Sequence, residues 1–488
     1  MPLLFCLFAL VLVALSWLVE AGAILAIFLS LSATALALGG FWLSARRDRR
    51  GVLLAAWSLV ILYLLNYQMQ FFLVGYMYQS ADYEGLLKML TIKPIVTSDE
   101  IQLRALRLLT LGFVLMCGAL CGWLNARGSG RRSLPAAVAS LGLVVADTRA
   151  INSTRAHQER RPLLILFLLA MAAIGIALPL QLLFNIGSLT NTDAAMDYRL
   201  GGVVYHLLVT FSPLLLLAIH ARALRNGLTF LGRASLAAYF SLALMETAMM
   251  TSRGYVVLQM LQVILLYAWL GVSRKRALGF AAATVAFGLV LYPVMTSIRN
   301  LRSNMGYSTS DSLKMAFTAS EESDQVASAL LVASRFIGYT SLLTSLHYGG
   351  ERFDLEQIDF AKIITLRESG FTRWYTEAVA GFGAGVRGHL SAPGLMGAGF
   401  VLGGVGFAVI IPALFALFCQ WLFESMSARA WRLGPVAPLA VFGVFLFLFN
   451  EGTFDISWLK LVATTGSLAV LTPLFDWILP PAAKRVRA

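Results

Sequence analysis

The residues IRNLRSNMGYSTSDSLKMAF (298–317) open the longest hydrophilic interval of the chain, which continues to FTRWYTEAVAGFGAGVRGHLS (371–391). Long apolar segments flank this interval on both sides. Its arginines and histidines are Arg299, Arg302, Arg335, Arg352, Arg367, Arg373, Arg387, His347 and His389. A hydrophilic interval of this size between apolar segments predicts a part of the chain that lies outside a membrane, while the flanking segments cross it.

Composition places the whole chain in the membrane class. Hydrophobic residues make up 59% and charged residues 13% of its 488 residues, and the mean hydropathy is +0.77. A soluble chain carries about 25% charged residues. Several apolar runs of roughly 18 residues or more fit transmembrane helices, whereas strands of a membrane barrel alternate over about ten residues.

The net charge of +13 has two interpretations. In a soluble protein it would suggest a nucleic-acid partner. In a membrane protein, Lys and Arg collect in cytoplasmic loops and meet anionic lipid. We therefore expect contact with membrane lipid and no nucleic-acid partner.

Apolar runs and the basic clusters between them predict an all-α polytopic membrane protein. We expect about twelve transmembrane helices with both termini in the cytoplasm. The expected spans are 3–18, 21–43, 52–74, 105–124, 163–184, 202–220, 228–250, 256–272, 277–297, 394–423, 436–449 and 457–477. The chain thus divides into helices one to nine (1–297), one large outer segment (298–391), and helices ten to twelve with a basic tail (392–488).

The large outer segment (298–391) is itself predicted to be rich in helices. Residues 320–348 predict an amphipathic helix with acidic residues in its first turn, which would lie on the membrane surface or against the bundle. A second short helix is expected over 359–367. The glycines of 371–389 suggest a loop whose backbone can approach a ligand closely.

Arg253 lies in the turn TSRGY (251–255) between two predicted helices. An arginine at membrane depth is costly and usually functional, although a surface arginine can also extend its head group to water. Glu246 lies about two helical turns earlier, so we expect it to share a helix face with Arg253. Neutralising an arginine is the first role expected for Glu246, and accepting a proton is the second.

The arginines of the outer segment suit a diphosphate, because the guanidinium fork matches phosphate oxygens. Each one alone has a plain alternative as a solvated charge or an exposed ion pair. His347 and His389 are each a candidate base or phosphate ligand. No spacing typical of metal ligands surrounds them, and the four cysteines (Cys6, Cys117, Cys121 and Cys419) read as small core residues without a disulfide.

Three features together resemble bacterial oligosaccharide repeat-unit polymerases of the Wzy type, which make O-antigen and exopolysaccharide. They are the Ser252-Arg253-Gly254 turn, the arginine-rich outer segment, and the run from SAPG (391–394) to GVG (404–406). The likeness covers mainly residues 250–421. One departure is that a second arginine-rich outer loop cannot be placed, because the loop 185–200 contains only Arg199.

The resemblance implies a glycosyltransferase of the bacterial inner membrane that acts at the periplasmic face. Its substrates would be undecaprenyl-diphosphate-linked oligosaccharides, and a chain-length regulator protein is the candidate protein partner. A leaving diphosphate needs cationic stabilisation and an attacking hydroxyl needs a base. The residues expected to bind the diphosphate are Arg253, Arg299, Arg302, Arg335, Arg373 and Arg387. The expected base is His389, followed by Glu377 or Glu246, and because arginine can replace a divalent metal here, we expect no metal or other cofactor.

Other classes stay open. An O-antigen ligase would use the same donor and transfer the glycan to lipid A core. A lipid-linked oligosaccharide flippase or another transporter would carry charges along the middle of its helices. Glu246 and His206 are nearly the only candidates, and both lie toward an outer helix end. A scaffold subunit would tolerate the loss of any single arginine.

Overall fold

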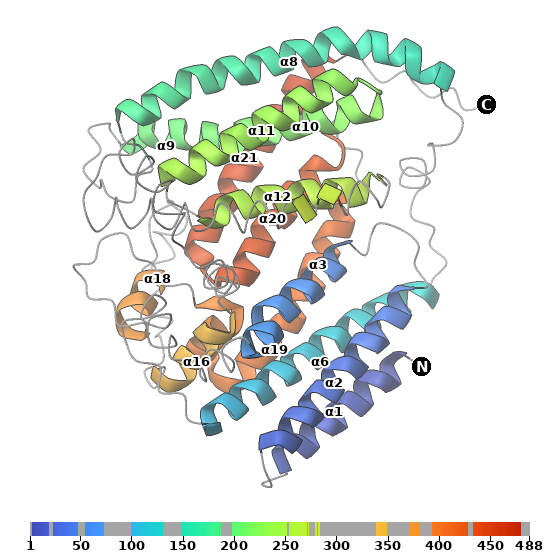
Figure 1. Cartoon of the computed structure of the whole chain (residues 1–488), viewed down its shortest axis with the longest axis vertical. Coiled ribbons are helices and arrows are strands. Elements are labelled where there is room, and N and C mark those ends of the chain that lie inside the picture. Colours follow the sequence, from blue (N-terminus) through green and yellow to red (C-terminus); the bar gives the residue numbers. More distant parts are fainter. Residues whose placement is uncertain are drawn as a thin grey trace. The chain divides into compact units, whose positions relative to one another are not determined.

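A computed structural model shows an all-helical chain (Figure 1). It describes residues 2–18, 23–46, 54–72, 99–129, 149–184, 186, 198–250, 253–270, 272, 279–280, 282–283, 338–348, 371–379, 393–427 and 433–479. Within these ranges every regular element is a helix and there is no strand. The predicted fold class is confirmed to this extent.

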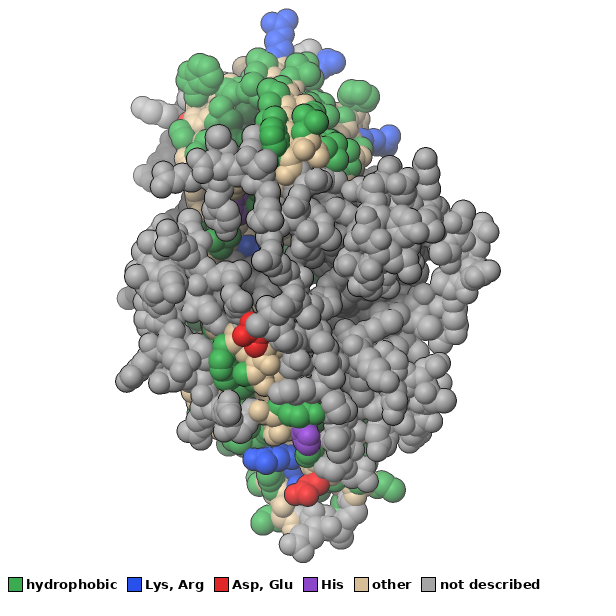
Figure 2. Space-filling model, turned by 90° about the vertical axis from the view of Figure 1, so that its left-hand side faces the viewer, with side chains coloured by type: hydrophobic (Ala, Val, Ile, Leu, Met, Phe, Trp, Pro, Cys, Tyr) green, Lys and Arg blue, Asp and Glu red, His purple; other side chains and the backbone are tan. Residues whose placement is uncertain are grey.

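By length and composition alone, six described helical segments could cross a membrane: Ala23–Ala45, Glu100–Ala126, Gln158–Leu183, Gly201–Arg225, Gly394–Ser427, which is divided at Gly404, and Ser457–Ile478. Shorter apolar helices cover Pro2–Leu18, Gln259–Trp269 and Val436–Glu451. Hydrophobic side chains make up most of the described surface in the view of Figure 2, and charged ones are few. The total of twelve spans and the orientation of the termini remain predictions, and most of predicted helix nine (277–297) lies outside the described residues.

The chain forms two compact units. The first unit comprises Met1–Ser133, Ala329–Ser425 and Val444–Leu459. It contains α1 (Pro2–Leu18), α2 (Ala23–Ala45), α3 (Leu54–Tyr63), the π-helix η2 (Leu64–Met69), α6 (Asp99–Ser129), α16 (Gly338–Tyr348), α18 (Phe371–Trp374), the π-helix η6 (Tyr375–Val379) and nearly all of α19 (Gly394–Ser427).

The packing of α1, α2 and α6 against one another (Figure 1) follows a membrane pattern. Small side chains such as Ala9, Ala33 and Ala37 are fully buried between the helices, whereas Phe8 and Phe28 are 64% exposed. Lipid is as apolar as a large side chain, so helices in a membrane gain most from close backbone approach at small residues.

The second unit comprises Leu134–Ser328, Met426–Gly443 and Lys460–Ala488. Its elements are α8 (Arg149–Leu183), α9 (Tyr198–His206), the π-helix η3 (Leu207–Phe211), α10 (Ser212–Arg225), α11 (Thr229–Met250) and α12 (Arg253–Trp269). The helices α20 (Val436–Glu451) and α21 (Phe454–Ile478) contribute residues to both units. Helix α8 begins at Arg149 rather than near residue 163, because polar residues extend it beyond the apolar run that the prediction followed.

Helix α19 is not the single continuous helix that its apolar sequence predicted. Gly404 has φ 75° and ψ −163°, which is not helical, so the element consists of two arms, 394–403 and 405–427. A Cβ on Gly399 would lie 3.0 Å from Ala408 Cα and 3.1 Å from Ile411 Cγ2. In a straight helix, Gly399 and Ala408 would stand about 13 Å apart. The two arms therefore fold back on each other at Gly404.

Replacing Gly404 with alanine should destabilise this reversal by about 1–3 kcal/mol, because its backbone conformation is essentially restricted to glycine. Gly406→Ala is the matched control, since a Cβ there meets nothing within 4 Å. Thermal unfolding of the purified protein in detergent measures both variants. Equal melting temperatures for the two would contradict the reversal.

Candidate functional site

The described residues include four of the nine predicted site residues, at least in backbone. Arg373 and Glu377 belong to the first unit, and Glu246 and Arg253 to the second. The side chains of Arg253 and Arg373 are not described. The remaining predicted site residues, which are Arg299, Arg302, Arg335, Arg387 and His389, lie outside the described residues.

The stretch that begins at Phe371 is helical as far as Val379, which corrects the predicted loop over its first part. Phe371, Tyr375 and Val379 are buried and form a hydrophobic cluster with Ala398 and Val401 of α19. Their spacing of four residues places them on one helix face. The glycines that suggested a loop come later, and Gly381, Gly383, Gly385 and Gly388 lie outside the described residues.

Tyr375 joins this stretch to α16. Its hydroxyl donates to the Ser341 carbonyl at 3.2 Å and lies 3.2 Å from Ser345 Oγ. Complete burial raises the pKa of the Tyr375 hydroxyl well above its usual value, so the group stays neutral and keeps its proton for this bond. The described part of the predicted helix 320–348, Gly338–Tyr348, is helical, and its buried residues show that it packs against neighbouring helices.

Partly buried aromatic side chains and the exposed Glu377 accompany this packed cluster. Tyr348, Trp374 and Phe454 are partly buried and pack against the cluster, and we call these three residues the aromatic surface. The rings of Phe454 and Phe371 are 4.8 Å apart. Glu377 is exposed on the adjoining turn, one helical turn after Arg373 in the chain.

Tyr67 of the π-helix η2 and Gln70, which directly follows it, bind the first turns of α19 and α16. Tyr67 Oη accepts a hydrogen bond from Met396 N at 3.2 Å, which satisfies one of the amides left open at the beginning of α19. Gln70 Oε1 accepts from Thr340 N at 3.5 Å in the first turn of α16. Both η2 and η6 are π-helical. Because π-helical turns are frequent at functional sites, these two elements make this region of the first unit a candidate functional site.

In the second unit, Glu246 is fully buried on α11. Gln181 Nε2 donates to Glu246 Oε2 at 2.9 Å. Glu246 Oε1 and Gln181 Oε1 have no hydrogen-bond partner among the described residues. The π-helix η3 packs against both α8 and α11, which carry this pair.

The expectation that Glu246 and Arg253 share a helix face is wrong. Helix α11 ends at Met250 and Arg253 begins α12, so the two residues lie on consecutive helices. Tyr239 donates a hydrogen bond to Gln259 Oε1, which shows that the chain reverses between the two helices. The break between Met250 and Arg253 interrupts the single continuous helix that the spacing of Glu246 and Arg253 required.

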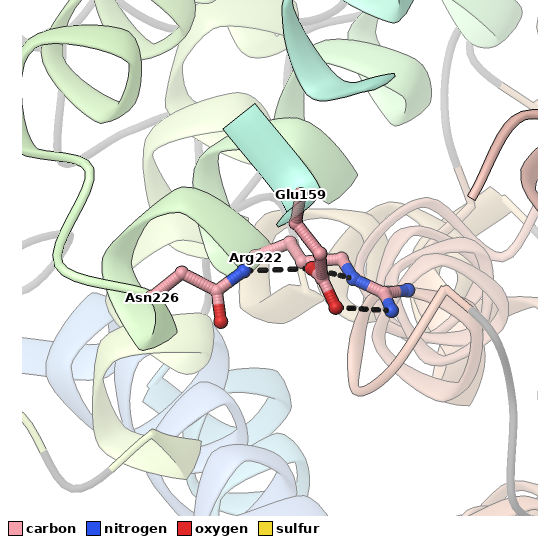
Figure 3. A network of polar contacts seen from close by, with 3 residues as sticks. All are labelled: Glu159, Arg222 and Asn226. Atoms are coloured by element: carbon pink, nitrogen blue, oxygen red, sulfur yellow. Dashed lines mark hydrogen bonds and ion pairs between the residues drawn. The ribbon is translucent and has the colours of Figure 1, made fainter. Parts of the chain in front are cut away.

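A polar network that the sequence did not single out joins α8 to α10 (Figure 3). Arg222 Nε donates to Glu159 Oε2 at 2.8 Å and its second nitrogen donates to Oε1 at 3.1 Å. Asn226 Nδ2 also donates to Glu159 Oε2, at 2.7 Å. The signal in the sequence was a single acidic residue beside Arg160 and Arg161. The geometry is that of a clamp between two helices rather than a reaction centre.

All four cysteines are buried and free, which confirms the prediction of core residues without a disulfide.

Removing the carboxylate of the clamp with Glu159→Ala should destabilise the protein by about 3 kcal/mol, because a buried ion pair loses one partner. Arg160→Ala, next to it and exposed, should change stability little. Denaturation of the purified variants in detergent checks this. A Glu159→Ala protein as stable as Arg160→Ala would show that the hydrogen bonds of Glu159 do not stabilise the packing of α8 against α10.

Comparison with known protein families, with curated proteins and with solved structures finds no match to this chain.

Proposed function

We propose that the protein is a membrane glycosyltransferase that polymerises undecaprenyl-diphosphate-linked oligosaccharide repeat units at the periplasmic face of a bacterial inner membrane. One observation carries the proposal. The described parts of the arginine-rich segment, α16 and α18–η6, fold onto the glycine-rich start of α19 and present the aromatic surface beside Glu377. These are the same stretches in which the sequence resembles Wzy-type polymerases.

The proposed reaction breaks the bond between the sugar anomeric carbon and the diphosphate of the donor. A hydroxyl of a second lipid-linked repeat unit forms the new glycosidic bond and gives up its proton to a base. The electron pair leaves with the diphosphate, whose charge is stabilised by arginines. In this proposal, arginines from the set Arg253, Arg299, Arg302, Arg335, Arg373 and Arg387 supply that charge without a metal ion.

The two carboxylates that are candidates for the base, Glu377 and Glu246, differ in exposure. Glu377 is exposed, so a substrate hydroxyl can reach its carboxylate. Glu246 is fully enclosed and already accepts a hydrogen bond from Gln181. A general base must come within hydrogen-bond reach of the proton that it removes. Of these two candidate carboxylates, Glu377 is therefore the better one, and His389 remains the alternative from the sequence.

A second function is favoured by one specific observation. An acidic residue enclosed among membrane helices is typical of ion or proton pathways in transporters, and Glu246 with Gln181 fits that description. The corresponding proposal is a lipid-linked oligosaccharide flippase. An O-antigen ligase would share the chemistry of the polymerase and differ in its acceptor, so its products distinguish it.

The cellular test compares glycan length on a gel from a deletion strain. Wild-type protein should restore a ladder of repeat units, whereas Arg253→Ala or Arg299→Ala should leave single repeat units, because loss of one charge-stabilising group costs about 10²–10³ in rate. Arg233→Ala, an exposed arginine on α11, is the matched control and should restore the ladder. Protein levels are measured for every variant.

The other outcomes of this experiment point elsewhere. Long glycan chains that are not attached to lipid A core in the deletion strain would identify a ligase. Repeat units that accumulate on the cytoplasmic face would identify a flippase. Unchanged glycan in the deletion strain would end the enzymatic proposal.

A further inference from the structure

The turn between α20 and α21 is held tightly against the start of α19 in the first unit. Gly452 has φ 65° and Gly394 has φ 63°. A Cβ on Gly452 would overlap the Gly394 carbonyl group, so the two backbones are in direct contact. The backbone of the turn is therefore held against the start of α19.

Three oxygen atoms at this turn are buried without a hydrogen-bond partner in the part of the chain that the structure describes. They are Asn450 Oδ1, Thr453 Oγ1 and Ser457 Oγ. Thr453 and Ser457 are each only 3% exposed. A buried polar group normally has a hydrogen-bond partner, because leaving it unpaired costs free energy.

The local structure makes these unpaired atoms unusual. Thr453 directly precedes α21, at a position where a threonine side chain commonly accepts a bond from the first turn of the helix. Ser457 lies one turn later, where a serine commonly donates to the carbonyl four residues before it, as Thr465 and Thr472 do further along the same helix. Neither Thr453 nor Ser457 has its usual local bond.

The donor and acceptor properties of the three groups indicate the class of ligand. A hydroxyl both donates and accepts, and an amide oxygen accepts. The Asn450 amide is oriented by the bond from its Nδ2 to Glu451 Oε1 at 3.0 Å, so its oxygen is the atom left over. An anion would find no donor on Asn450 Oδ1 and would meet the charge of Glu451. Alcohol groups, which can both donate and accept hydrogen bonds, complement all three atoms.

Aromatic rings next to the turn also favour a ligand that carries alcohol groups, such as a sugar. Phe454 follows Thr453 and is part of the aromatic surface, and Trp458 follows Ser457 and is 40% exposed. A sugar ring presents apolar C–H groups beside its hydroxyls, and flat aromatic rings bury such groups well. Asn450 and Glu451 themselves are only partly buried.

We infer that the α20–α21 turn is a saccharide site, in which Asn450, Thr453 and Ser457 bind hydroxyl groups of the lipid-linked glycan beside the aromatic surface. This inference rests on the proposed function for its substrate, and it adds the part of the protein that recognises the sugar. The arginines would hold the diphosphate, whereas this turn would hold the repeat unit.

The test uses the full-length protein in detergent and the lipid-free repeat-unit oligosaccharide prepared from the host strain's own surface glycan. Saturation-transfer NMR measures binding to wild type and to the double variant Thr453→Val, Ser457→Ala. We expect about 10-fold weaker binding for each lost hydrogen bond. The melting temperature of the free protein should stay the same or rise, because the substitutions remove buried polar groups that have no partner.

Thr465→Val is the matched control, since this exposed hydroxyl on the same helix is bonded to its own backbone. It should leave binding unchanged. Ser457→Ala alone gives the same comparison if the double variant does not fold. A double variant that binds the oligosaccharide as wild type does would overturn the inference, whether or not its melting temperature falls, and so would a wild-type protein without any saturation transfer.

A sodium control separates a saccharide site from a cation site, because hydroxyl and amide oxygens also bind cations. Replacing sodium chloride with choline chloride should not change the melting temperature of wild type. A drop in melting temperature that occurs in wild type and is absent in the double variant would assign the three oxygens to a cation and overturn the inference.

The failure of this site and the failure of the proposed function give different results. Oligosaccharide binding without polymerisation in cells would support this site and count against the polymerase. Polymerisation with undiminished binding by the double variant would count against this site alone.

Discussion

The contact between Gly394 and Gly452 is the constraint on which the described site depends. With no Cβ on either residue, the start of α19 touches the turn between α20 and α21, and a Cβ on Gly394 would lie only 3.3 Å from Gly338 Cα in α16. Three backbone segments that are distant in sequence therefore meet at glycines. In a bilayer such close approach replaces the hydrophobic driving force that holds soluble cores together.

Two buried acidic residues of the second unit, Glu159 and Glu246, have different hydrogen-bond partners for their carboxylates. Glu159 is neutralised by the two-pronged bond from Arg222 and a third bond from Asn226. Among the residues whose side chains the structure describes, the partner of Glu246 is the neutral amide of Gln181 instead. A carboxylate without a cationic partner is costly to bury, so it is retained where it has a role or where it takes up a proton. This difference separates Glu159, which is paired with a cation, from Glu246, whose described partner is neutral.

Much of the helical content was predictable from apolar runs, because a membrane helix and its hydrophobic stretch have similar lengths. The expected spans 228–250 and 436–449 lie close to α11 (Thr229–Met250) and α20 (Val436–Glu451). Hydropathy could not show the reversal at Gly404, since both arms of α19 are apolar, nor the polar extension of α8. The sequence named Glu377, Glu246 and Arg253, but the partners Gln181, Arg222 and Tyr67 depend on tertiary packing that spacing alone does not reveal.

The most direct test of the central claim is reconstitution with a single substrate. The purified protein in liposomes is given undecaprenyl-diphosphate-linked repeat units in the presence of EDTA, and both glycan length and free undecaprenyl diphosphate are measured. The account predicts longer glycans with one undecaprenyl diphosphate released for each bond formed. Repeat units that cross the membrane without elongation, or elongation that stops when EDTA is added, would contradict it.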